Sequence, residues 1–262
     1  MSAYKNMILL QAPVAYYAMD DLAGVQCTDY STSGQHGTYE NGIALAQTGL
    51  LVSEPSGVSV DLDGVDDQIT YGIGGLGNLI SGAAQVTVSF WANLDVYSPA
   101  SNSQRFLYIV RDGSSSGLVV DIFDNGASTR FYARTDAADT DIVSVAAQSL
   151  DVVHHYGAIF DFANDKIFVV IDGVEVTAGG GAASSFTNGV YTLGTPSSND
   201  HTGAGTSGRL NASMAHLALF NYNLGVAGLK NHYAQGRNWM EQNKKRVVRP
   251  RSGLYSVRHM GL

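Results

Sequence analysis

Four aspartates lie within seven positions of the stretch VDLDGVDDQI, residues 60–69. Carboxylates at this density could ligate calcium or form the acid–base pair of a glycosidase. An EF-hand calcium loop requires glycine at its sixth position and glutamate at its twelfth, but counting from Asp61 these positions hold Asp66 and Gly72. Asp61 and Asp63 could share one face of a strand, as any two residues at that spacing do. The pattern therefore favours a polar turn between two strands over a metal loop or a catalytic pair.

Two glycine motifs match known catalytic patterns, but their surroundings disfavour both matches. GIGGLG (72–77) fits the dinucleotide-binding fingerprint, yet only the eight residues NLISGAAQ precede the next strand pattern, too few for a crossover helix. GSSSG (113–117) fits a nucleophile elbow with Ser115 at its centre, but a strand pattern follows where that motif needs a helix. The seven histidines show no His-x-His or His-x-x-x-His spacing, so a zinc site is not expected.

The sequence patterns around these residues predict β-strands. VTVSFWANLDV (86–96) alternates between apolar residues and a second face that carries polar residues and Trp91, the pattern of a half-buried strand. KIFVVIDGVEVTA (166–178) places Asp172-Gly173 between two β-branched runs, which predicts a two-residue hairpin with positive φ at both turn positions. Similar patterns predict further strands at 105–110, 117–123, 129–134, 141–146 and 155–162.

Helical spacing is confined to 224–245, where Leu229 and Tyr233 fall on one face and Gly228 and Gly236 weaken the pattern. We therefore predict an all-β, antiparallel two-sheet sandwich with a short C-terminal helix. The expected organisation is an N-terminal arm at 1–12, one sandwich domain at 13–236 and a basic extension at 237–262. The single cysteine, Cys27, excludes an internal disulfide. The first 21 residues lack the pattern of a secretory signal, so we expect synthesis in the cytoplasm.

Charge is distributed unevenly along the chain. The net charge is −8, yet residues 237–262 carry seven basic residues against one acid, Glu241, which leaves −14 on the remaining 236 residues. An acidic body with a basic extension predicts two separate roles, and the extension is the candidate partner-binding segment. Its binding residues would be Lys244, Lys245, Arg246, Arg249, Arg251 and Arg258. Nucleic acid is not the expected partner, because the acidic body would repel it.

Six segments occur in an order that resembles the laminin-G-like jelly roll of the concanavalin A-like lectin/glucanase superfamily, over about residues 13 to 236. DYSTSGQHGT, which begins at Asp29, resembles the opening loop of that family. VDLDGVDDQITYG resembles its aspartate-rich strand and turn, and the Asp172-Gly173 segment resembles its Asp-Gly-Val hairpin. The remaining segments are VTVSFWANLD (86–95), YTLGTPSS (191–198) and the closing strand and helix at 208–236.

The resemblance implies that the aspartates of 60–69 support a turn and that a structural calcium ion, with Asp29 as candidate ligand, lies near the opening loop. The closing strand departs from the family pattern, because Ala215-His216 stands where Asp-Glu is usual. Calcium prefers six to eight oxygen ligands, so this departure removes a carboxylate from the site. The four glutamates do not form the E-x-D-x-x-E strand of the family's β-glucan hydrolases, so we expect no enzymatic activity and no other cofactor.

Two functions from different classes remain. The first is a structural component of a tailed-bacteriophage virion, decorating the capsid or associated with the tail, whose partners are other virion proteins or copies of itself. The second is a carbohydrate-binding module for host-surface glycans, with no membrane partner. Exposed aromatic rings would form its binding platform, although core and turn packing is the favoured interpretation of the same rings; the candidates are Trp91, Tyr97, Tyr108, Phe131 and Tyr132.

Overall fold

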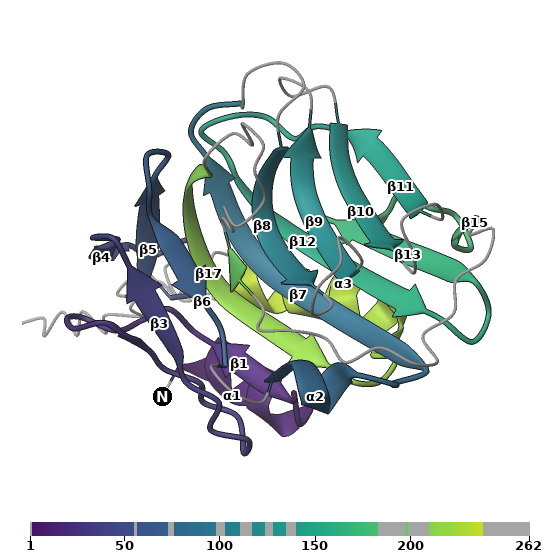
Figure 1. Ribbon diagram of the computed structural model, residues 1–262, viewed down its shortest axis with the longest axis horizontal. Helices are drawn as coiled ribbons and strands as arrows, with labels where there is room; N and C mark the ends of the chain where they lie inside the picture. Colours follow the sequence, from purple (N-terminus) through teal and green to yellow (C-terminus); the bar gives the residue numbers. More distant parts are fainter. Residues whose placement is uncertain are drawn as a thin grey trace, which may run out of the picture.

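The computed structural model describes residues 2–54, 57–72, 76–97, 103–110, 117–123, 128–134, 140–182, 197–198 and 210–237. In these segments two antiparallel β-sheets pack face to face, with helices against the outer side of one sheet (Figure 1). The predicted all-β sandwich with a short C-terminal helix is confirmed.

The first sheet is built from strands drawn from the whole length of the described chain. They are β1 (Ala15–Tyr17), β4 (Ala44–Thr48), β5 (Val58–Asp63), β7 (Gln85–Leu94), β12 (Val153–Asp161), β13 (Lys166–Ile171), β14 (Val174–Glu175), β15 (Gly181–Ala182) and β17 (Asn211–Phe220). Their order is β14-β13-β12-β7-β17-β5-β4, with β1 beside β17 and β15 beside β13. The last long strand, β17, therefore lies in the middle of the sheet and joins early and late parts of the chain.

The second sheet contains the strands that the sequence predicted between residues 105 and 146. Its described members are β2 (Gln26–Cys27), β3 (Gly37–Glu40), β6 (Gln68–Thr70), β8 (Ser103–Val110), β9 (Gly117–Phe123), β10 (Ser128–Arg134), β11 (Thr140–Ala146) and β16 (Ser197–Ser198). The order is β11-β10-β9-β8-β16-β6-β3-β2. Strands β8 to β11 form a continuous antiparallel meander.

The hairpin between β13 and β14 has the predicted geometry. Asp172 has φ of 50° and Gly173 has φ of 76°, so both turn residues are left-handed. The Asp172 carboxylate also accepts hydrogen bonds from the preceding strand: Oδ1 from the His155 amide at 2.9 Å, and Oδ2 lies 2.6 Å from His154 Nδ1. This turn residue thereby ties the hairpin to β12.

Strand β7 differs from its prediction in one respect. The predicted inward face is confirmed, with Phe90 and Val88 each 1% exposed in the core between the sheets. The other face was expected to be half exposed, but Ser89 and Trp91 are also only 1% exposed. The prediction fails on that face because helices cover it.

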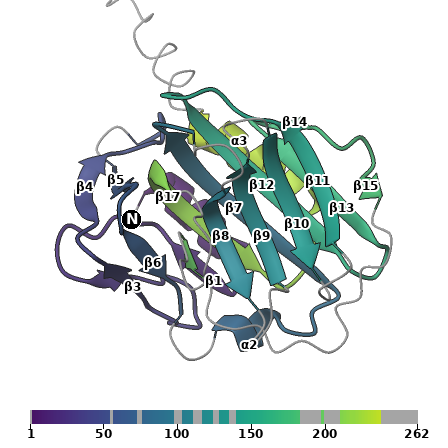
Figure 2. The same ribbon diagram turned by 45° about the horizontal axis from the view of Figure 1, so that its top comes forward.

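One covering helix is α3 (Gly225–Arg237), which lies across the outer face of the first sheet (Figure 2). Its Leu229 is fully buried and packs with Ile159 of β12 and Val170 of β13. Gly236 lies so close to β7 that a Cβ added there would come within 2.3 Å of Trp91 Cζ2. The glycine that weakens the helical pattern in the sequence is therefore required by packing against the indole.

The other covering helix is α1 (Ala3–Leu10), which forms within the segment expected to be an arm. Ser2 caps it, accepting a hydrogen bond from the Lys5 amide at 3.2 Å. Tyr4 and Ile8, one turn apart, are buried against the sheet, and Trp91 Nε1 donates to the Tyr4 hydroxyl at 2.9 Å. A five-residue helix, α2 (Leu76–Ile80), begins within the last two residues of the first glycine motif.

Among the described residues, no helix combines the length and apolar character needed to span a bilayer.

Candidate functional site

A β-bulge in β17 creates the candidate site. The pairing register between β17 and β7 shifts between Ala215 and Ala218, and His216 has a left-handed φ of 57°. The extra residue lets Met214 and Leu217 both face the core, although they lie three positions apart. His216 is turned outward, where it contacts Tyr4 of α1 at a ring separation of 5.0 Å.

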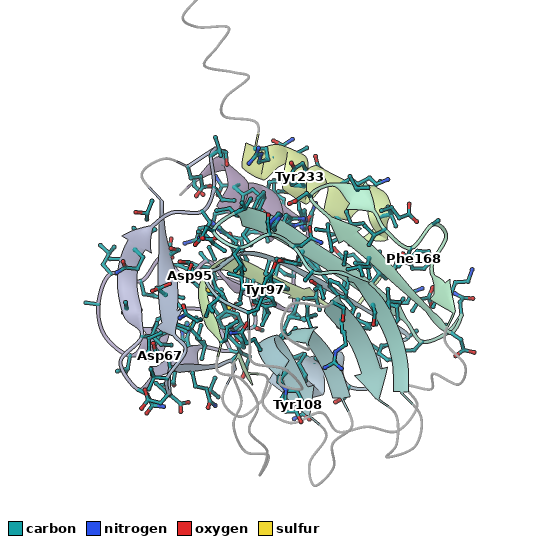
Figure 3. All side chains as sticks on the ribbon, turned by 90° about the horizontal axis from the view of Figure 1, so that it is seen from above. Asp67, Asp95, Tyr97, Tyr108, Phe168 and Tyr233 are labelled. Carbon is teal, nitrogen blue, oxygen red and sulfur yellow. The ribbon has the colours of Figure 1, made fainter. Side chains whose placement is uncertain are left out.

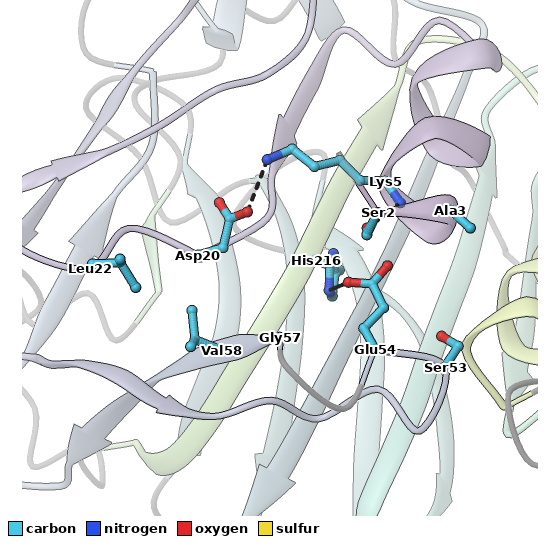
Figure 4. A pocket seen from close by; sticks show the side chains of 10 residues that line it. All are labelled: Ser2, Ala3, Lys5, Asp20, Leu22, Ser53, Glu54, Gly57, Val58 and His216. Atoms are coloured by element: carbon cyan, nitrogen blue, oxygen red, sulfur yellow. Dashed lines mark hydrogen bonds and ion pairs between the residues drawn. The ribbon is translucent and has the colours of Figure 1, made fainter.

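The bulge opens into a cavity of about 450 Å³ between α1, β17 and the connection from β4 to β5 (Figure 4). This volume lies within the range of small-molecule binding sites. Four segments that are distant in the sequence line it: Ser2, Ala3 and Lys5; Asp20 and Leu22; Ser53, Glu54, Gly57 and Val58; and His216. Six of these ten side chains can form hydrogen bonds or carry charge, and they stand beside the apolar Ala3, Leu22 and Val58.

Three oxygens of the lining are buried and have no hydrogen-bond partner: Asp20 Oδ1, Ser53 Oγ and Glu54 Oε1. A buried polar atom without a partner costs roughly 1–3 kcal/mol, and most such atoms in folded proteins are paired. All three belong to residues that line this cavity, so a turn of their side chains would let water or a polar ligand supply the missing bonds.

An ion pair forms one wall of the cavity. Lys5 Nζ lies 3.0 Å from Asp20 Oδ2, and the Lys5 side chain is only 7% exposed. The same ammonium sits over the ring of Tyr30, which adds a cation–π contact. Lys5 is thus held by two partners and fixes α1 to the segment that follows β1.

Opposite this pair, His216 and Glu54 face one another without a hydrogen bond. His216 Nε2 lies 3.9 Å from Glu54 Oε2, and the two side chains are 7% and 12% exposed. Burial lowers the pKa of His216 to about 3, so its imidazole is neutral at neutral pH. Burial also raises the pKa of Glu54, an effect that the Ser2 hydroxyl and the Tyr4 amide partly offset. The carboxylate therefore lacks a cationic partner of its own.

The second ring nitrogen of His216 is held by Tyr16 of β1, whose hydroxyl lies 2.6 Å from Nδ1. Burial raises the pKa of Tyr16 well above its usual value, so this phenol keeps its proton. When the phenol donates to Nδ1, the imidazole proton resides on Nε2 and points toward the Glu54 carboxylate, which favours this tautomer electrostatically. The site thereby presents one N–H donor beside a carboxylate acceptor.

The aspartate-rich stretch forms the predicted turn, and it connects β5 of the first sheet to β6 of the second. Gly64 has φ of 74°, Asp63 Oδ1 accepts from the Val65 amide at 2.7 Å, and Asp67 Oδ2 accepts from the Asp63 amide at 3.0 Å. Carboxylate oxygens of Asp63, Asp66 and Asp67 lie within 4.8 Å of one another. Two of the three aspartates bond backbone amides of the turn itself, which is the structural role expected of them.

Asp29, the candidate calcium ligand, is 4% exposed and organises the opening loop. Its Oδ1 accepts from the amides of Tyr16 and Ser31, and its Oδ2 accepts from the hydroxyls of Ser31 and Ser33 and the amide of Gln35, all at 2.8–2.9 Å. A carboxylate has about four lone-pair positions, and protein donors occupy them here. His216 contacts Tyr4, Tyr16 and Glu54 instead of Asp29, so the residues present do not fit a calcium ion.

The four candidate rings that the structure describes do not form the proposed aromatic platform. Trp91 is 1% exposed and Phe131 is fully buried, so the core interpretation of these two rings is confirmed. Tyr97 is half-buried with its hydroxyl on the Gln148 carbonyl, and Tyr108 is half-buried under the Arg105 guanidinium. These two tyrosines lie well apart from each other (Figure 3). The side chain of Tyr132 lies outside the described residues.

The remaining predicted residues also fall outside the described part of the chain. They are Ser115 and the basic residues Lys244, Lys245, Arg246, Arg249, Arg251 and Arg258. The partner-binding role of the basic extension therefore stays a prediction.

The sequence interpretation missed the cavity and its residues Lys5, Glu54 and His216. One signal was present for His216: in SMAHLALF the apolar alternation breaks, since Met214 and Leu217 are both core residues at an odd spacing. Such a break indicates a bulge, and bulges often redirect a side chain beside a binding site.

No family model and no curated protein sequence matches this chain. Solved structures do match it in fold. The binding domain of botulinum neurotoxin serotype D/C superposes with a TM-score of 0.65 at 10% identity, over 87% of this chain and 53% of that one. Botulinum neurotoxin type C, whose passage into cells depends on interaction with two ganglioside molecules, gives 0.63 at 12% identity, over 87% of this chain and 52% of that one.

A Trypanosoma rangeli sialidase in complex with 2,3-difluorosialic acid gives a TM-score of 0.61 at 11% identity, over 86% of this chain and 33% of that one. The chain thus spans about half the length of the toxin domains and a third of the sialidase. At these identities the likeness concerns the fold alone. The chain is a β-sandwich of the jelly-roll kind.

Proposed function

We propose that this chain is a non-enzymatic interaction module that binds glycans through the cavity beside α1. The observation that carries the proposal is the set of three buried, unpartnered oxygens, from Asp20, Ser53 and Glu54, around one cavity of about 450 Å³. Sugar hydroxyls donate and accept hydrogen bonds, so they can satisfy both these oxygens and the Nε2–H of His216. The cavity volume is suited to one or two sugar rings.

The solved structures of similar fold give independent support of a weaker kind. Two are toxin binding domains, one of them in complex with rat synaptotagmin II, and a third toxin is described through its interaction with gangliosides. Fold likeness does not transfer a ligand. It does make a binding role compatible with a sandwich of this size, and the cavity then supplies the specific argument.

One group of three residues could contradict the proposal that the chain is not an enzyme. Ser149 Oγ lies 3.2 Å from His154 Nε2, and His154 Nδ1 lies 2.6 Å from Asp172 Oδ2, the connectivity of a serine-hydrolase triad. We assign these contacts to the hairpin brace, because the Asp172 carboxylate also accepts the His155 amide in the turn between β13 and β14. Incubation with a fluorophosphonate should leave the protein unlabelled. Stoichiometric labelling that is lost in Ser149→Ala would overturn the non-enzymatic assignment.

A second candidate concerns where the module works. We propose, from the laminin-G-like order of its sequence segments, that it belongs to the virion of a tailed bacteriophage, with the basic extension anchoring it to an acidic neighbour or to another copy of itself. The support is the contrast between seven basic residues in 237–262 and a net charge of −14 elsewhere. The glycan and virion roles are compatible, because a particle-bound sandwich could present its cavity to a host surface.

Two experiments separate these candidates. A glycan array probed with the full chain tests the first, and an array without any signal above background would refute glycan binding. Deletion of 238–262 tests the second, since the truncated chain should keep glycan binding and fail to join purified particles. A truncated chain that still assembles would refute the anchoring role of the extension.

A further inference from the structure

The cavity contains more acceptors and more negative charge than its own donors can satisfy. Lys5 is paired with Asp20 at 3.0 Å, and the neutral His216 offers a single N–H. The Glu54 carboxylate therefore leaves the lining with a net charge of about −1 when it is ionised. Glu54 Oε1 and Asp20 Oδ1 can act only as acceptors in that state.

From this imbalance we infer that the cavity selects a sugar that carries an unacetylated amino group beside its hydroxyls, and rejects sugars that carry a carboxylate. The inference rests on the proposed glycan-binding function and specifies its ligand class. An ammonium group would supply the cation that the Glu54 carboxylate lacks, and its three N–H donors can reach the oxygens of Asp20, Ser53 and Glu54 once these side chains turn into the cavity. A neighbouring hydroxyl can accept from His216 Nε2, which has no hydrogen-bond partner at 3.9 Å from Glu54.

Selection against carboxylated sugars follows from the same groups. A sialic acid carboxylate in this cavity would lie near Glu54 and Asp20, while Lys5 is already neutralised by Asp20 and held over Tyr30. Like charges in a partly desolvated site repel strongly. The ligand class therefore differs from the difluorosialic acid bound by the sialidase of similar fold.

The ammonium would also restore favourable surroundings for Glu54. Burial raises the pKa of this carboxyl group in the unliganded protein, and an adjacent cation favours the ionised form. Amino-sugar affinity should accordingly rise with pH as Glu54 ionises and fall again once the ligand's amine loses its proton. The affinity for a neutral sugar should neither rise nor fall with pH in this way.

The test is calorimetric titration of the full chain with four ligands: the methyl glycosides of glucosamine, glucose and N-acetylglucosamine, and free N-acetylneuraminic acid. We expect the glucosaminide to bind about tenfold more tightly than the glucoside or its N-acetylated form, since one charge-assisted hydrogen bond separates them. N-acetylneuraminic acid should give no measurable heat.

Two matched variants locate the effect. Glu54→Gln keeps the side-chain shape but removes the charge, so it should reduce the preference for the amine to about twofold or less. Glu175→Gln makes the same change at a half-buried glutamate that lies 3.8 Å from Lys230, away from the cavity, and should keep the wild-type preference.

The outcomes separate this inference from the proposed function. Equal binding of the glucosaminide and the glucoside, or a preference that survives Glu54→Gln, overturns the inference while glycan binding stands. Failure of the glucosaminide to bind also overturns the inference, whereas glycan binding itself is overturned by a glycan array without signal. A lysine derivative, Nα-acetyl-lysine methylamide, that binds as tightly as the glucosaminide would show that the hydroxyls contribute nothing and that the occupant is a protein side chain, which also overturns the inference.

Discussion

Two regions on the outer face of the first sheet bury histidines under helices, but the two regions differ in how many hydrogen-bond partners they give these histidines. Under α3, Ser89 Oγ lies 2.9 Å from both His155 Nε2 and His232 Nδ1, and His232 Nε2 lies 2.6 Å from Gln11 Oε1. Under α1, His216 has Tyr16 on one nitrogen and only Glu54, at 3.9 Å, near the other. The first region is a closed hydrogen-bond chain and the second is open.

The direction of the closed chain follows from its end. Gln11 Oε1 accepts from His232 Nε2, so His232 Nδ1 must accept from the Ser89 hydroxyl, and Ser89 Oγ then accepts from His155 Nε2. What remains is His155 Nδ1, a buried atom without a partner that carries no hydrogen in this arrangement. An unpaired lone pair at the end of a chain is a smaller cost than an unpaired N–H.

The comparison teaches how buried polar groups divide between structure and binding. The α3 chain satisfies nearly every group from within the protein, and it sits beside no described cavity. The α1 region leaves the oxygens of Asp20, Ser53 and Glu54 unpartnered around a cavity. We therefore expect groups of the α3 chain to stabilise the fold and groups of the cavity to weaken it in the absence of ligand.

Acidification should produce the largest effect. Burial lowers the pKa of His232 to about 4, that of His216 to about 3, and that of His155 well below 6.5. Between these values and the unfolded pKa of 6.5 the unfolded chain binds more protons, so stability falls as the pH falls from about 6.5 toward 4. His232 alone should account for up to about 3 kcal/mol of that loss.

Urea unfolding from pH 7 to pH 4.5 measures this dependence. In a His232→Asn variant, the slope of the unfolding free energy against pH should decrease by the equivalent of about one bound proton. An unfolding free energy that stays constant across this range would contradict the assignment of the buried histidines as neutral.

Removing one serine hydroxyl from each region tests the comparison itself. Ser89→Ala leaves nitrogens of two buried histidines without a partner and should lower the unfolding free energy by about 2 kcal/mol. Ser53→Ala deletes a hydroxyl that has no partner, so its effect should lie between zero and a gain of about 1 kcal/mol. Equal losses in the two variants, measured by urea unfolding at pH 7, would abolish the distinction between the regions.

The charge in the cavity should also cost stability. Glu54→Gln removes a carboxylate whose pKa is raised by burial, so we expect the unfolding free energy at pH 7 to rise by about 0.5–1 kcal/mol. Thermal and urea unfolding of the variant beside Glu175→Gln measure this change. A clear loss of stability in Glu54→Gln would indicate that Glu54 braces the fold.

Metal removal should have the smallest effect. The carboxylate of Asp29 is occupied by protein donors, and two aspartates of the turn after β5 bond its backbone amides. A chelator should therefore shift the melting temperature by no more than about 1 °C. Stabilisation by added calcium that disappears in Asp66→Asn would place a cation at this turn after all.

The sequence predicted features that depend on neighbours along the chain. The Asp172-Gly173 hairpin, the strands of the meander and the aspartate turn all arise from local patterns, and each was confirmed. Helix α1 was missed because eight residues with only two core positions give a weak signal, and packing against Trp91 stabilises it.

The cavity could not be predicted for a related reason. It joins Lys5, Asp20, Glu54 and His216, which come from four separate segments and meet through the pairing of β17 with β1 and β5 and the packing of α1 on the sheet. His216 additionally depends on the bulge in β17. Residues brought together by long-range strand pairing have no characteristic separation along the chain, so a sequence pattern cannot identify them.

Amide and imidazole chemical shifts of the isotopically labelled chain, recorded during titration with methyl glucosaminide, test the central claim most directly. The account predicts saturable shifts confined to the residues around the cavity, led by His216, Glu54 and Lys5, with β8 to β11 unchanged. Shifts centred on that meander, or saturation without any change at His216, would contradict it.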